Sequence, residues 1–308
     1  MKSNKIQGGA EVLINFEDWE IDNESPFGSG ASEKKWLINP ITKEKGIFKF
    51  PKGINIGKPT GEYWAEKLAS QLAEVLKIEC AKVDIGIFQG KVGSMSYMIL
   101  KEDEELIEGI QYITTAYKSY DEDKFIDYET GESYSINMIY NSIKETGLFN
   151  EFLKIPIFDA LIGNSDRHHS NWGIIENKKS EVLKLSPLYD NGSSLCCLIK
   201  DEDALNFLRD KMRFNSLIFS KSKSMIRWSG NKRIRHFELV EEIRKEYFLE
   251  TIGFVEKIKN NLNDKIIEDI IYQYDDSIIS KNLKKLLFEF LKERRNRIIK
   301  IYFEECEK

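Results

Sequence analysis

The sequence is poor in cysteine, in long apolar runs and in the marks of an exported protein. Its four cysteines, Cys80, Cys196, Cys197 and Cys306, lack the spacing of a disulfide framework, so reduced thiols are expected. The longest apolar runs contain only a few residues, whereas a helix that crosses a bilayer needs about 20. No apolar segment follows the positive charges of the N-terminus, which argues against a secretory signal. These absences predict a cytoplasmic protein without a membrane span, and they leave delivery into a host cell open.

An excess of positive charge is missing as well. The 308 residues contain 46 Lys and Arg against 51 Asp and Glu, which gives a net charge of −5. A chain with this balance has no global attraction to nucleic acid, so no specific nucleic-acid partner is expected. The apolar fraction of 41% and the charged fraction of 31% are typical of a globular protein. The length is about twice that of a common domain, which predicts one bilobal domain or two small ones.

The first third of the chain has the pattern of short strands around one helix. Alternation of apolar and polar residues predicts strands that begin an antiparallel sheet, and apolar residues four apart predict a helix over residues 61–76. The expected strands cover residues 12–16, 35–38, 46–50, 83–88 and 96–100. We expect these elements to form an N-terminal lobe over residues 1–101.

The rest of the chain, residues 102–308, is expected to be mostly helical. Helical patterns cover residues 136–145, residues 151–162 and the chain from about Phe237 to its end. Pro156 is expected to kink the second of these helices or to delay its start. The predicted fold class is therefore α+β, with a small antiparallel sheet and one main helix followed by a larger helical lobe.

Three polar residues in the helical part have the spacing of a phosphoryl-transfer site. Asp166 and Asn171 are five residues apart, and Asp190 follows 19 residues further on, just before Asn191-Gly192. Phosphoryl transfer needs a carboxylate at the attacking hydroxyl and oxygen ligands that hold Mg²⁺ across the ATP phosphates. Protein kinases use the same five-residue spacing, with a second Asp further on before a Gly. The alternative, that Asp166 and Asn171 only form polar turns or helix caps, does not explain why Asp190 accompanies them.

The stretch Asp-Arg-His-His-Ser-Asn-Trp-Gly from residue 166, followed by Leu-Tyr-Asp-Asn-Gly from residue 188, resembles the HipA-type kinase family. These are bacterial Ser/Thr kinases of toxin–antitoxin systems, and the likeness is greatest to the shorter members. The resemblance implies a two-lobed, protein-kinase-like fold. It also implies an ATP- and Mg²⁺-dependent protein serine/threonine kinase that acts as a bacterial toxin or effector and is able to autophosphorylate.

The resemblance assigns roles to single residues. It makes Asp166 the catalytic base and Asn171 and Asp190 the ligands of Mg²⁺, and it implies that His168 supports the loop by hydrogen bonds. In the N-terminal lobe the family's phosphate-binding strand lysine matches Lys49, and its helix glutamate, which orients that lysine, matches Glu66. Lys52 and Glu62 are close rivals for these two roles.

The resemblance also places the nucleotide. Gly28, Ser29 and Gly30 match the loop that covers the phosphates, and their small side chains let backbone amides approach an anion. Adenine is expected against residues 97–101, with Ile99 and Leu100 in contact. Candidate sites of self-phosphorylation are the nearby serines Ser25, Ser29 and Ser32.

The expected partner is a protein with a Ser or Thr acceptor, docked near residues 191–229, and an antitoxin is a second candidate partner. Two alternatives stay open. The same motif resembles phosphatidylinositol kinases, and the six basic residues Lys221, Lys223, Arg227, Lys232, Arg233 and Arg235 suit an anionic head group, so a lipid or small-molecule kinase is one alternative. A pseudokinase that only binds a partner is the other.

Overall fold

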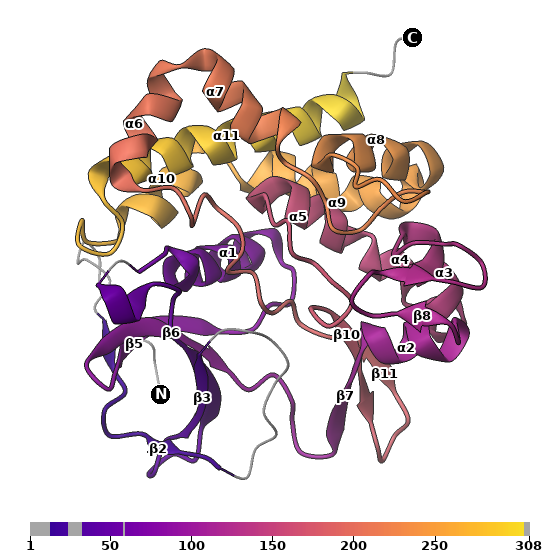
Figure 1. Cartoon of the computed structure of the whole chain (residues 1–308), viewed down its shortest axis with the longest axis horizontal. Helices are drawn as coiled ribbons and strands as arrows, with labels where there is room; N and C mark the ends of the chain where they lie inside the picture. Colours follow the sequence, from indigo (N-terminus) through magenta and orange to yellow (C-terminus); the bar gives the residue numbers. More distant parts are fainter. Residues whose placement is uncertain (1–12, 24–32, 58, 305–308) are drawn as a thin grey trace.

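A curled six-stranded sheet and one long helix form the N-terminal part of the molecule (Figure 1). The computed structural model describes residues 13–23, 33–57 and 59–304. The strand order is β1-β5-β6-β4-β3-β2. The strands are β1 (Ile14–Asn15), β2 (Glu20–Ile21), β3 (Lys34–Ile38), β4 (Lys45–Lys49), β5 (Val83–Phe88) and β6 (Lys91–Tyr97).

The predicted strands are all present, with two differences. The first strand was expected to begin an antiparallel sheet, but β1 lies at the sheet edge and pairs with β5 in parallel. This approach is so close that a Cβ on Gly86 would lie 2.3 Å from the carbonyl oxygen of Ile14, which explains the glycine. The last strand was expected over residues 96–100, but β6 ends at Tyr97, and residues 98–101 lack regular structure.

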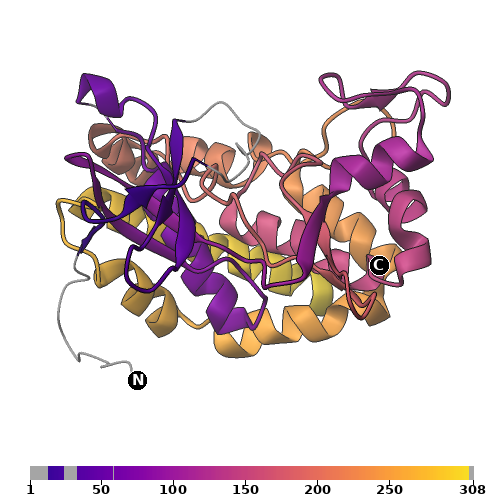
Figure 2. The same ribbon diagram turned by 90° about the horizontal axis from the view of Figure 1, so that it is seen from below.

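The helix α1 (Glu62–Leu76) joins the sheet to the rest of the molecule. Its spacing of large apolar residues four apart, with alanines beside them, makes one wide buried face. The helix packs against β5 and β6 on one side and against α9 and α10 on the other, as Figure 1 shows. It ends at Lys77, whose φ of 55° is left-handed and stops the helix. The sheet itself is curled (Figure 2). Its buried aromatic cluster includes Phe16, Phe48 and Phe88.

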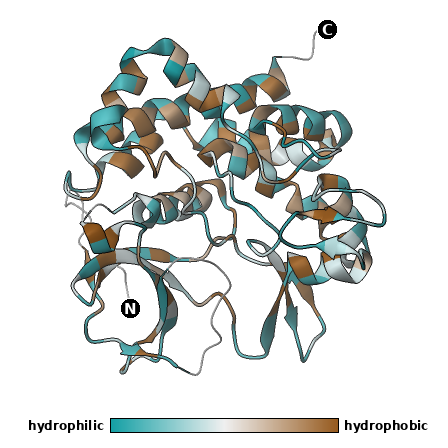
Figure 3. Ribbon diagram, in the orientation of Figure 1, coloured by the Kyte–Doolittle hydropathy of each residue, from teal (hydrophilic) through white to brown (hydrophobic). Residues whose placement is uncertain are grey.

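The second lobe is built mainly from helices, which pack around a large apolar core and turn their hydrophilic positions outward (Figure 3). The α-helices are α2 (Gly109–Ala116), α3 (Ile136–Ile143), α4 (Phe149–Phe152), α5 (Lys154–Ile162), α6 (Asp201–Arg209), α7 (Lys211–Asn215), α8 (His236–Glu246), α9 (Phe248–Asn261), α10 (Asp264–Tyr272) and α11 (Lys281–Phe303). Short helical turns are η1 (Ile54–Ile56), η2 (Lys144–Thr146) and η3 (Ser216–Ser220). Within the described ranges no helix is long and apolar enough to cross a membrane.

The prediction that the chain after residue 102 is mostly helical missed two small sheets. An antiparallel sheet joins β7 (Glu104–Glu108), β10 (Gly173–Asn177) and β11 (Leu183–Leu185), and β8 (Tyr120–Asp121) pairs with β9 (Ile126–Asp127). The strand β7 was invisible in the sequence because three of its five residues are glutamates and none of the five is fully buried, so it lacks the apolar pattern of a core strand. The lobe boundary at residues 101 and 102 stays a prediction.

The segment predicted as a helix over residues 151–162 consists of two helices that meet at Leu153. Pro156 lies in the first turn of α5, where its missing N–H has no helical partner to lose. The helix α5 is buried after its first residue and ends at Gly163, whose φ of 71° is left-handed. A Cβ at Gly163 would also lie 2.7 Å from the ring of Phe290. Glycine at this position therefore allows α5 to end and the polar loop that carries Asp166 to begin.

Candidate active site

Two adjoining cavities lie between the sheet lobe and the helical lobe. The outer one has a volume of about 530 Å³ and the inner one about 170 Å³, and Lys49 and Asp190 line both. The outer cavity also contains Ile99, Leu100 and Asn171. The inner cavity also contains Glu66, Asp166 and His168. The fold thus brings together all eight predicted site residues that lie in the described ranges. Gly28, Ser29 and Gly30, as well as Ser25 and Ser32, lie outside those ranges.

The loop from Asn164 to Asn171 is held in shape by its own polar groups. The amide of Asp166 donates to the side-chain oxygen of Asn164 (3.0 Å), and the side-chain nitrogen of Asn171 donates to the backbone oxygen of Asp166 (2.8 Å). The backbone of His168 bridges these two residues with bonds of 2.8 and 2.9 Å. Because the side-chain nitrogen of Asn171 donates the bond to Asp166, its side-chain oxygen is the atom left to bind a ligand.

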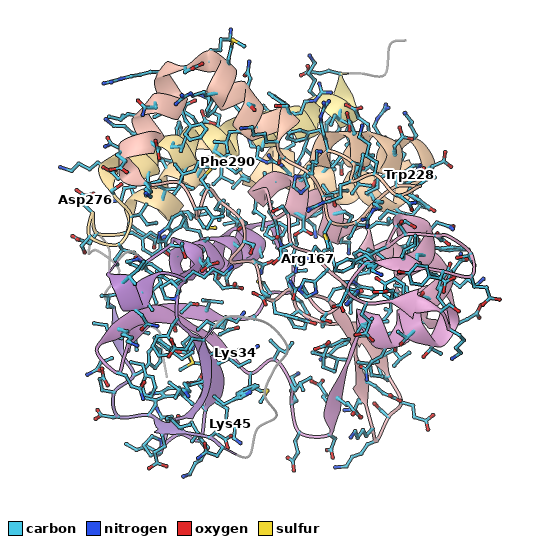
Figure 4. All side chains as sticks on the ribbon, in the orientation of Figure 1. Lys34, Lys45, Arg167, Trp228, Asp276 and Phe290 are labelled. Carbon is cyan, nitrogen blue, oxygen red and sulfur yellow. The ribbon has the colours of Figure 1, made fainter. Side chains whose placement is uncertain are left out.

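Arg167 fastens this loop to the loop that carries Asp190. Its side chain is 1% exposed and forms a two-pronged ion pair with Asp159 of α5, with bonds of 3.0 and 2.8 Å. The same guanidinium donates to the backbone oxygens of Asn171 and Tyr189 and to the side chain of Asn191. Figure 4 shows Arg167 at the centre of the molecule, below α5. Burial disfavours its charge, but Asp159 raises the pKa of Arg167 above its ordinary value.

Lys49 and Asp190 form an ion pair where the two cavities meet. Lys49 Nζ lies 3.0 Å from Asp190 Oδ1, with the two side chains 19% and 46% exposed. The charge of Lys49 lowers the pKa of Asp190, which keeps the carboxylate ionised. Burial alone would lower the pKa of Lys49, but Asp190 and Glu66 together raise it. Asp190 has a φ of 55°, and such a left-handed conformation outside glycine is typical of functional sites.

The expected ion pair between Lys49 and Glu66 is replaced by a different arrangement. Glu66 is 2% exposed on α1, and its carboxylate accepts a hydrogen bond from the backbone N–H of Asn191 (2.8 Å). Burial raises the pKa of Glu66, and the charge of Lys49 and the Asn191 N–H oppose that shift. Glu66 therefore positions the backbone that follows Asp190. It acts on Lys49 through its charge rather than by direct contact.

The rival residues Lys52 and Glu62 pair with each other. Lys52 Nζ lies 3.1 Å from one oxygen of Glu62, and the amide of Lys52 donates to the other oxygen (3.0 Å). The Lys52 side chain is 64% exposed, compared with 19% for Lys49. Lys49 and Lys52 both line the inner cavity, but only Lys49 also lines the outer one. The geometry therefore favours Lys49 over Lys52 for a ligand that extends through both cavities.

The outer cavity offers an apolar wall and open backbone groups. Trp36, Ile47 and Leu106 line it together with Ile99 and Leu100. The backbone groups of Ile99 and Leu100 have no hydrogen-bond partner among the residues that the structure describes. A flat heterocycle with a donor and an acceptor at its edge fits such a wall.

The three histidines have different surroundings. His168 accepts a hydrogen bond from the amide of Ser170 (3.2 Å), which agrees with a supporting role in the loop. His169 is buried beside the hydroxyl of Tyr120 (3.0 Å), and burial lowers its pKa to about 4. His236 of α8 is buried too, with Nε2 2.7 Å from the backbone oxygen of Asn164. Since a carbonyl oxygen only accepts, Nε2 carries the proton there, and burial lowers the pKa of His236 to about 3.

The donor set of the cleft fits a magnesium ion. Asn171 and Asp190 both line the outer cavity, and the side-chain nitrogen of Asn171 and one carboxylate oxygen of Asp190 are engaged in the contacts described above, which leaves one side-chain oxygen of each residue for a cation. Mg²⁺ is usually bound by one or two protein oxygens and completes its shell with phosphate oxygens and water. Two protein oxygens beside a cavity of about 530 Å³ therefore satisfy this requirement.

Sequence reasoning missed Asp159, Asn164, Asn191 and His236, which position the loops. One of them had a visible signal, because Asp159 is the lone charge in the apolar run of α5, and such a carboxylate needs a buried partner. That partner is Arg167. His236 had no signal, because its contact with Asn164 spans 72 residues of sequence.

A small sheet lobe, a larger helical lobe and a polar cleft between them define the class of the molecule, which has the two-lobed fold of protein kinases. Within this class the chain belongs to the family of HipA-like C-terminal domains. The model of that family matches residues 27–270, which is most of the chain. The resemblance read from residues 166–173 and 188–192 is thereby confirmed.

Several relatives are more specific. The chain is 21% identical over 299 residues to the serine/threonine-protein kinase CtkA of Helicobacter pylori, a match that covers 94% of this chain and 87% of the relative. It is 28% identical over 172 residues to the putative kinase Y4dM of Sinorhizobium fredii, which covers 54% of this chain and 41% of that protein.

Solved structures show the same fold. The crystal structure of the Helicobacter pylori proinflammatory kinase CtkA aligns with a TM-score of 0.79 at 21% identity, covering 94% of this chain and 97% of that one. HipA of Shewanella oneidensis, solved in complex with HipB and operator DNA, aligns with a TM-score of 0.55 at 14% identity. This match covers 90% of this chain and 65% of HipA.

Proposed function

We propose that this chain is an ATP- and Mg²⁺-dependent protein serine/threonine kinase. The single observation that carries the proposal is the convergence of Lys49, Asp166, Asn171 and Asp190 on two connected cavities. Kinase chemistry needs this set of one cation, one base and two oxygen ligands. The likeness to the serine/threonine-protein kinase CtkA supports the same activity and a protein acceptor.

In the proposed mechanism the chain acts mainly by positioning. Adenine lies in the outer cavity against Ile99 and Leu100, and Lys49 binds the phosphates, helped by the loop of Gly28, Ser29 and Gly30. Asp166 aligns the acceptor hydroxyl and takes its proton while the new P–O bond forms and the bond to ADP breaks. The hydroxyl of Ser193 lies 3.4 Å from Asp166 Oδ2, so the carboxylate is open to a hydroxyl donor from the inner cavity.

Asn171 and Asp190 are the proposed ligands of Mg²⁺, which supplies positive charge at the phosphate oxygens when it is bound. Arg167 and Glu66 are positioning residues. They hold the chain on both sides of Asp190 through Tyr189 and Asn191. His168 supports the loop of Asp166 from within.

The wider biological role follows from the family. We propose that the kinase acts as a bacterial toxin or effector in the cytoplasm, that it phosphorylates itself at Ser25, Ser29 or Ser32, and that an antitoxin is its partner. The HipA structure that contains HipB supports the last point. The acceptor protein is proposed to dock near residues 191–229, which follow Asp190 and include Ser193 of the inner cavity.

One alternative has an observation in its favour. The basic residues between Ser220 and Arg235 lie near the loop of Asp166, since Arg233 donates to the backbone oxygen of Ser165 (2.7 Å). An anionic lipid head group or a small phosphorylated molecule would suit that charge. The chemistry at Asp166 would be unchanged, and only the acceptor would differ.

The test is transfer of labelled phosphate. The purified chain and its Asp166→Asn variant are incubated with γ-labelled ATP, Mg²⁺ and a generic protein acceptor. We expect the variant to lose about a hundredfold or more of the label transfer while it still binds ATP, since the carboxylate acts on the acceptor and not on the nucleotide. Asp123→Asn, in the exposed turn between β8 and β9, is the matched control and should transfer normally. Equal transfer by all three proteins would contradict the role of Asp166.

A further inference from the structure

Two arginines beside the loop of Asp166 lack the carboxylate partners that arginines in such places usually have. They lie in the basic segment, which we define as residues 221–235, between η3 and α8 (Figure 1). This segment is fixed in place at both ends. Lys223 forms a β-bridge with Arg235, and the amide of His236 donates to the backbone oxygen of Ser222 (3.0 Å).

Arg233 lies against the loop itself. Its Nη2 donates to the backbone oxygen of Ser165, the residue before Asp166, at 2.7 Å, and its Nε donates to the backbone oxygen of Ser224 at 2.9 Å. The third nitrogen, Nη1, has no hydrogen-bond partner among the described residues. Its two N–H donors are therefore available to a ligand.

Arg227 lies close to Arg233, and its side chain donates fewer hydrogen bonds than that of Arg233. Its backbone is tied to the helical lobe, because its amide donates to Tyr134 (3.0 Å) and its carbonyl accepts from Ile136 (2.9 Å). Its side chain donates once, from Nε to the backbone oxygen of Asn231 (3.1 Å). Its Nη1 is buried without any partner in the part of the chain that the structure describes.

Burial lowers the pKa of both guanidinium groups. The charge of Arg233 lowers the pKa of Arg227 further, whereas the carboxylate of Asp166 opposes the shift of Arg233. No Asp or Glu of the described ranges forms an ion pair with either one, whereas Arg235 of the same segment pairs with Glu238 at 3.0 Å. Two half-buried like charges without a carboxylate in direct contact raise the free energy of the empty site, since Asp166 acts on Arg233 only from a distance, and a bound anion reduces that cost.

We infer that Arg227 and Arg233 form an anion-binding site for an acidic side chain, a carboxylate or a phosphate, of the acceptor polypeptide. The inference rests on the proposed function and names the substrate class of that site. Because Arg233 contacts the residue next to Asp166, the anion lies about one or two residues along the acceptor from the hydroxyl that receives the phosphate. Guanidinium groups suit this task, since they bind carboxylates and phosphates through paired hydrogen bonds.

The test compares short peptides that contain one serine flanked on both sides by Asp, by Asn or by Lys, with phosphoserine flanks as a further arm. Fluorescence anisotropy gives the binding affinity of the labelled peptides, and γ-labelled ATP gives kcat/KM. We expect the full chain to favour the Asp-flanked peptide over the Asn-flanked one by about tenfold in both measurements. Arg233→Gln and Arg227→Gln should each bring that ratio close to one.

The controls separate charge recognition from a structural effect. Arg235→Gln makes the same change two residues away from Arg233, at a residue already paired with Glu238, and should keep the full preference. Arg233→Glu should reverse the preference toward the Lys-flanked peptide, which a merely misplaced loop would not do. A variant that loses affinity for all peptides equally would overturn the inference.

The outcomes also distinguish this inference from the proposed function. Transfer to protein without any preference for acidic flanks would overturn the anion site and leave the kinase intact. Preferential binding of the Asp-flanked peptide that depends on Arg233, without any transfer from ATP, would keep the site and contradict the kinase. Transfer to phosphatidylinositol vesicles and to none of the peptides would overturn both the polypeptide acceptor and this inference.

Discussion

Two ion pairs of the cleft are built in opposite ways. Arg167 and Asp159 are 1% and 2% exposed, and every nitrogen of the guanidinium donates to a fixed oxygen. Lys49 and Asp190 are 19% and 46% exposed, and they face two cavities instead of packed side chains. The first pair is costly to disturb, because no water replaces a lost partner. The second pair is open to exchange with an incoming phosphate or cation.

This contrast separates scaffold from chemistry. The buried pair fixes where Asn171 and Tyr189 lie, so both loops keep their positions in the absence of ligand. In the open pair, the charge of Lys49 keeps Asp190 ionised. The same lysine is able to attract the phosphates of ATP. Four variants or conditions test how far this separation extends, and they are ordered by the size of the expected effect.

The largest effect is expected from breaking the buried pair. Arg167→Leu leaves the carboxylate of Asp159 buried without a charged partner, with only the hydrogen bond from Asn164 (3.2 Å), which should lower the free energy of unfolding by about 3–5 kcal/mol. Urea denaturation followed by fluorescence measures the change. The control is Arg235→Leu, which removes an exposed ion pair and should cost less than about 1 kcal/mol. Equal losses of unfolding free energy in the two variants would mean that the buried ion pair stabilises the fold no more than the exposed one.

The next effect concerns His236, which connects the scaffold to Asn164. Its folded-state pKa of about 3 lies below its unfolded value of about 6.5, so the unfolded chain binds the proton more readily. The stability from neutral His236 is thus complete above pH 6.5 and declines as the pH falls toward the folded pKa. Between pH 6.5 and 4.5 this histidine alone should lower the free energy of unfolding by about 2 kcal/mol.

Denaturation curves at several pH values measure that slope. The variant His236→Gln keeps a donor for Asn164 but has no group that titrates in this range, so its curve should be flatter than that of the parent chain. His169, whose folded pKa is about 4, adds a similar slope in both proteins and cancels in the difference. Parallel curves would show that His236 is protonated in the folded state as easily as in the unfolded one.

Removing a charge from the open pair should weaken ligand binding more than it lowers the stability of the fold. Lys49→Met removes the cation at the junction of the two cavities and should weaken ATP binding by about 1.5 kcal/mol, or roughly tenfold. Its effect on the free energy of unfolding should stay below about 1 kcal/mol, since Asp190 is nearly half exposed. Calorimetric titration with ATP and Mg²⁺, set beside urea denaturation, separates the two quantities. A large loss of stability with unchanged ATP affinity would place Lys49 in the scaffold.

The same division explains what was predictable from the sequence. The candidate site was visible because a metal or phosphate site constrains residue types at short spacing, and Asp166, Asn171 and Asp190, which have that spacing, all line the two cavities. The helix α1 and most strands of the first sheet were visible because their burial follows a regular period. The family resemblance added the expectation that these elements form a two-lobed, kinase-like fold.

The contacts between distant segments were not predictable. Whether Lys49 would meet Glu66 or Asp190 depends on how the turn after Tyr189 approaches α1, and no local pattern encodes that approach. The parallel pairing of β1 with β5 likewise joins residues more than 70 positions apart. Asp159 gave a partial signal, since a lone carboxylate in a buried helix demands a partner without saying which one.

The smallest effect is expected at the rival pair, and it sharpens the assignment of Lys49. Lys52 is 64% exposed and is already neutralised by Glu62 outside the region where the cavities meet. Lys52→Met should therefore change the free energy of unfolding by less than about 1 kcal/mol. ATP affinity, measured by the same titration as for Lys49→Met, should fall by much less than tenfold. If the Lys52 variant lost more ATP affinity than the Lys49 variant, the phosphate-binding lysine would be Lys52, with Glu62 as its orienting partner, and the open pair of Lys49 and Asp190 would only be a resting contact.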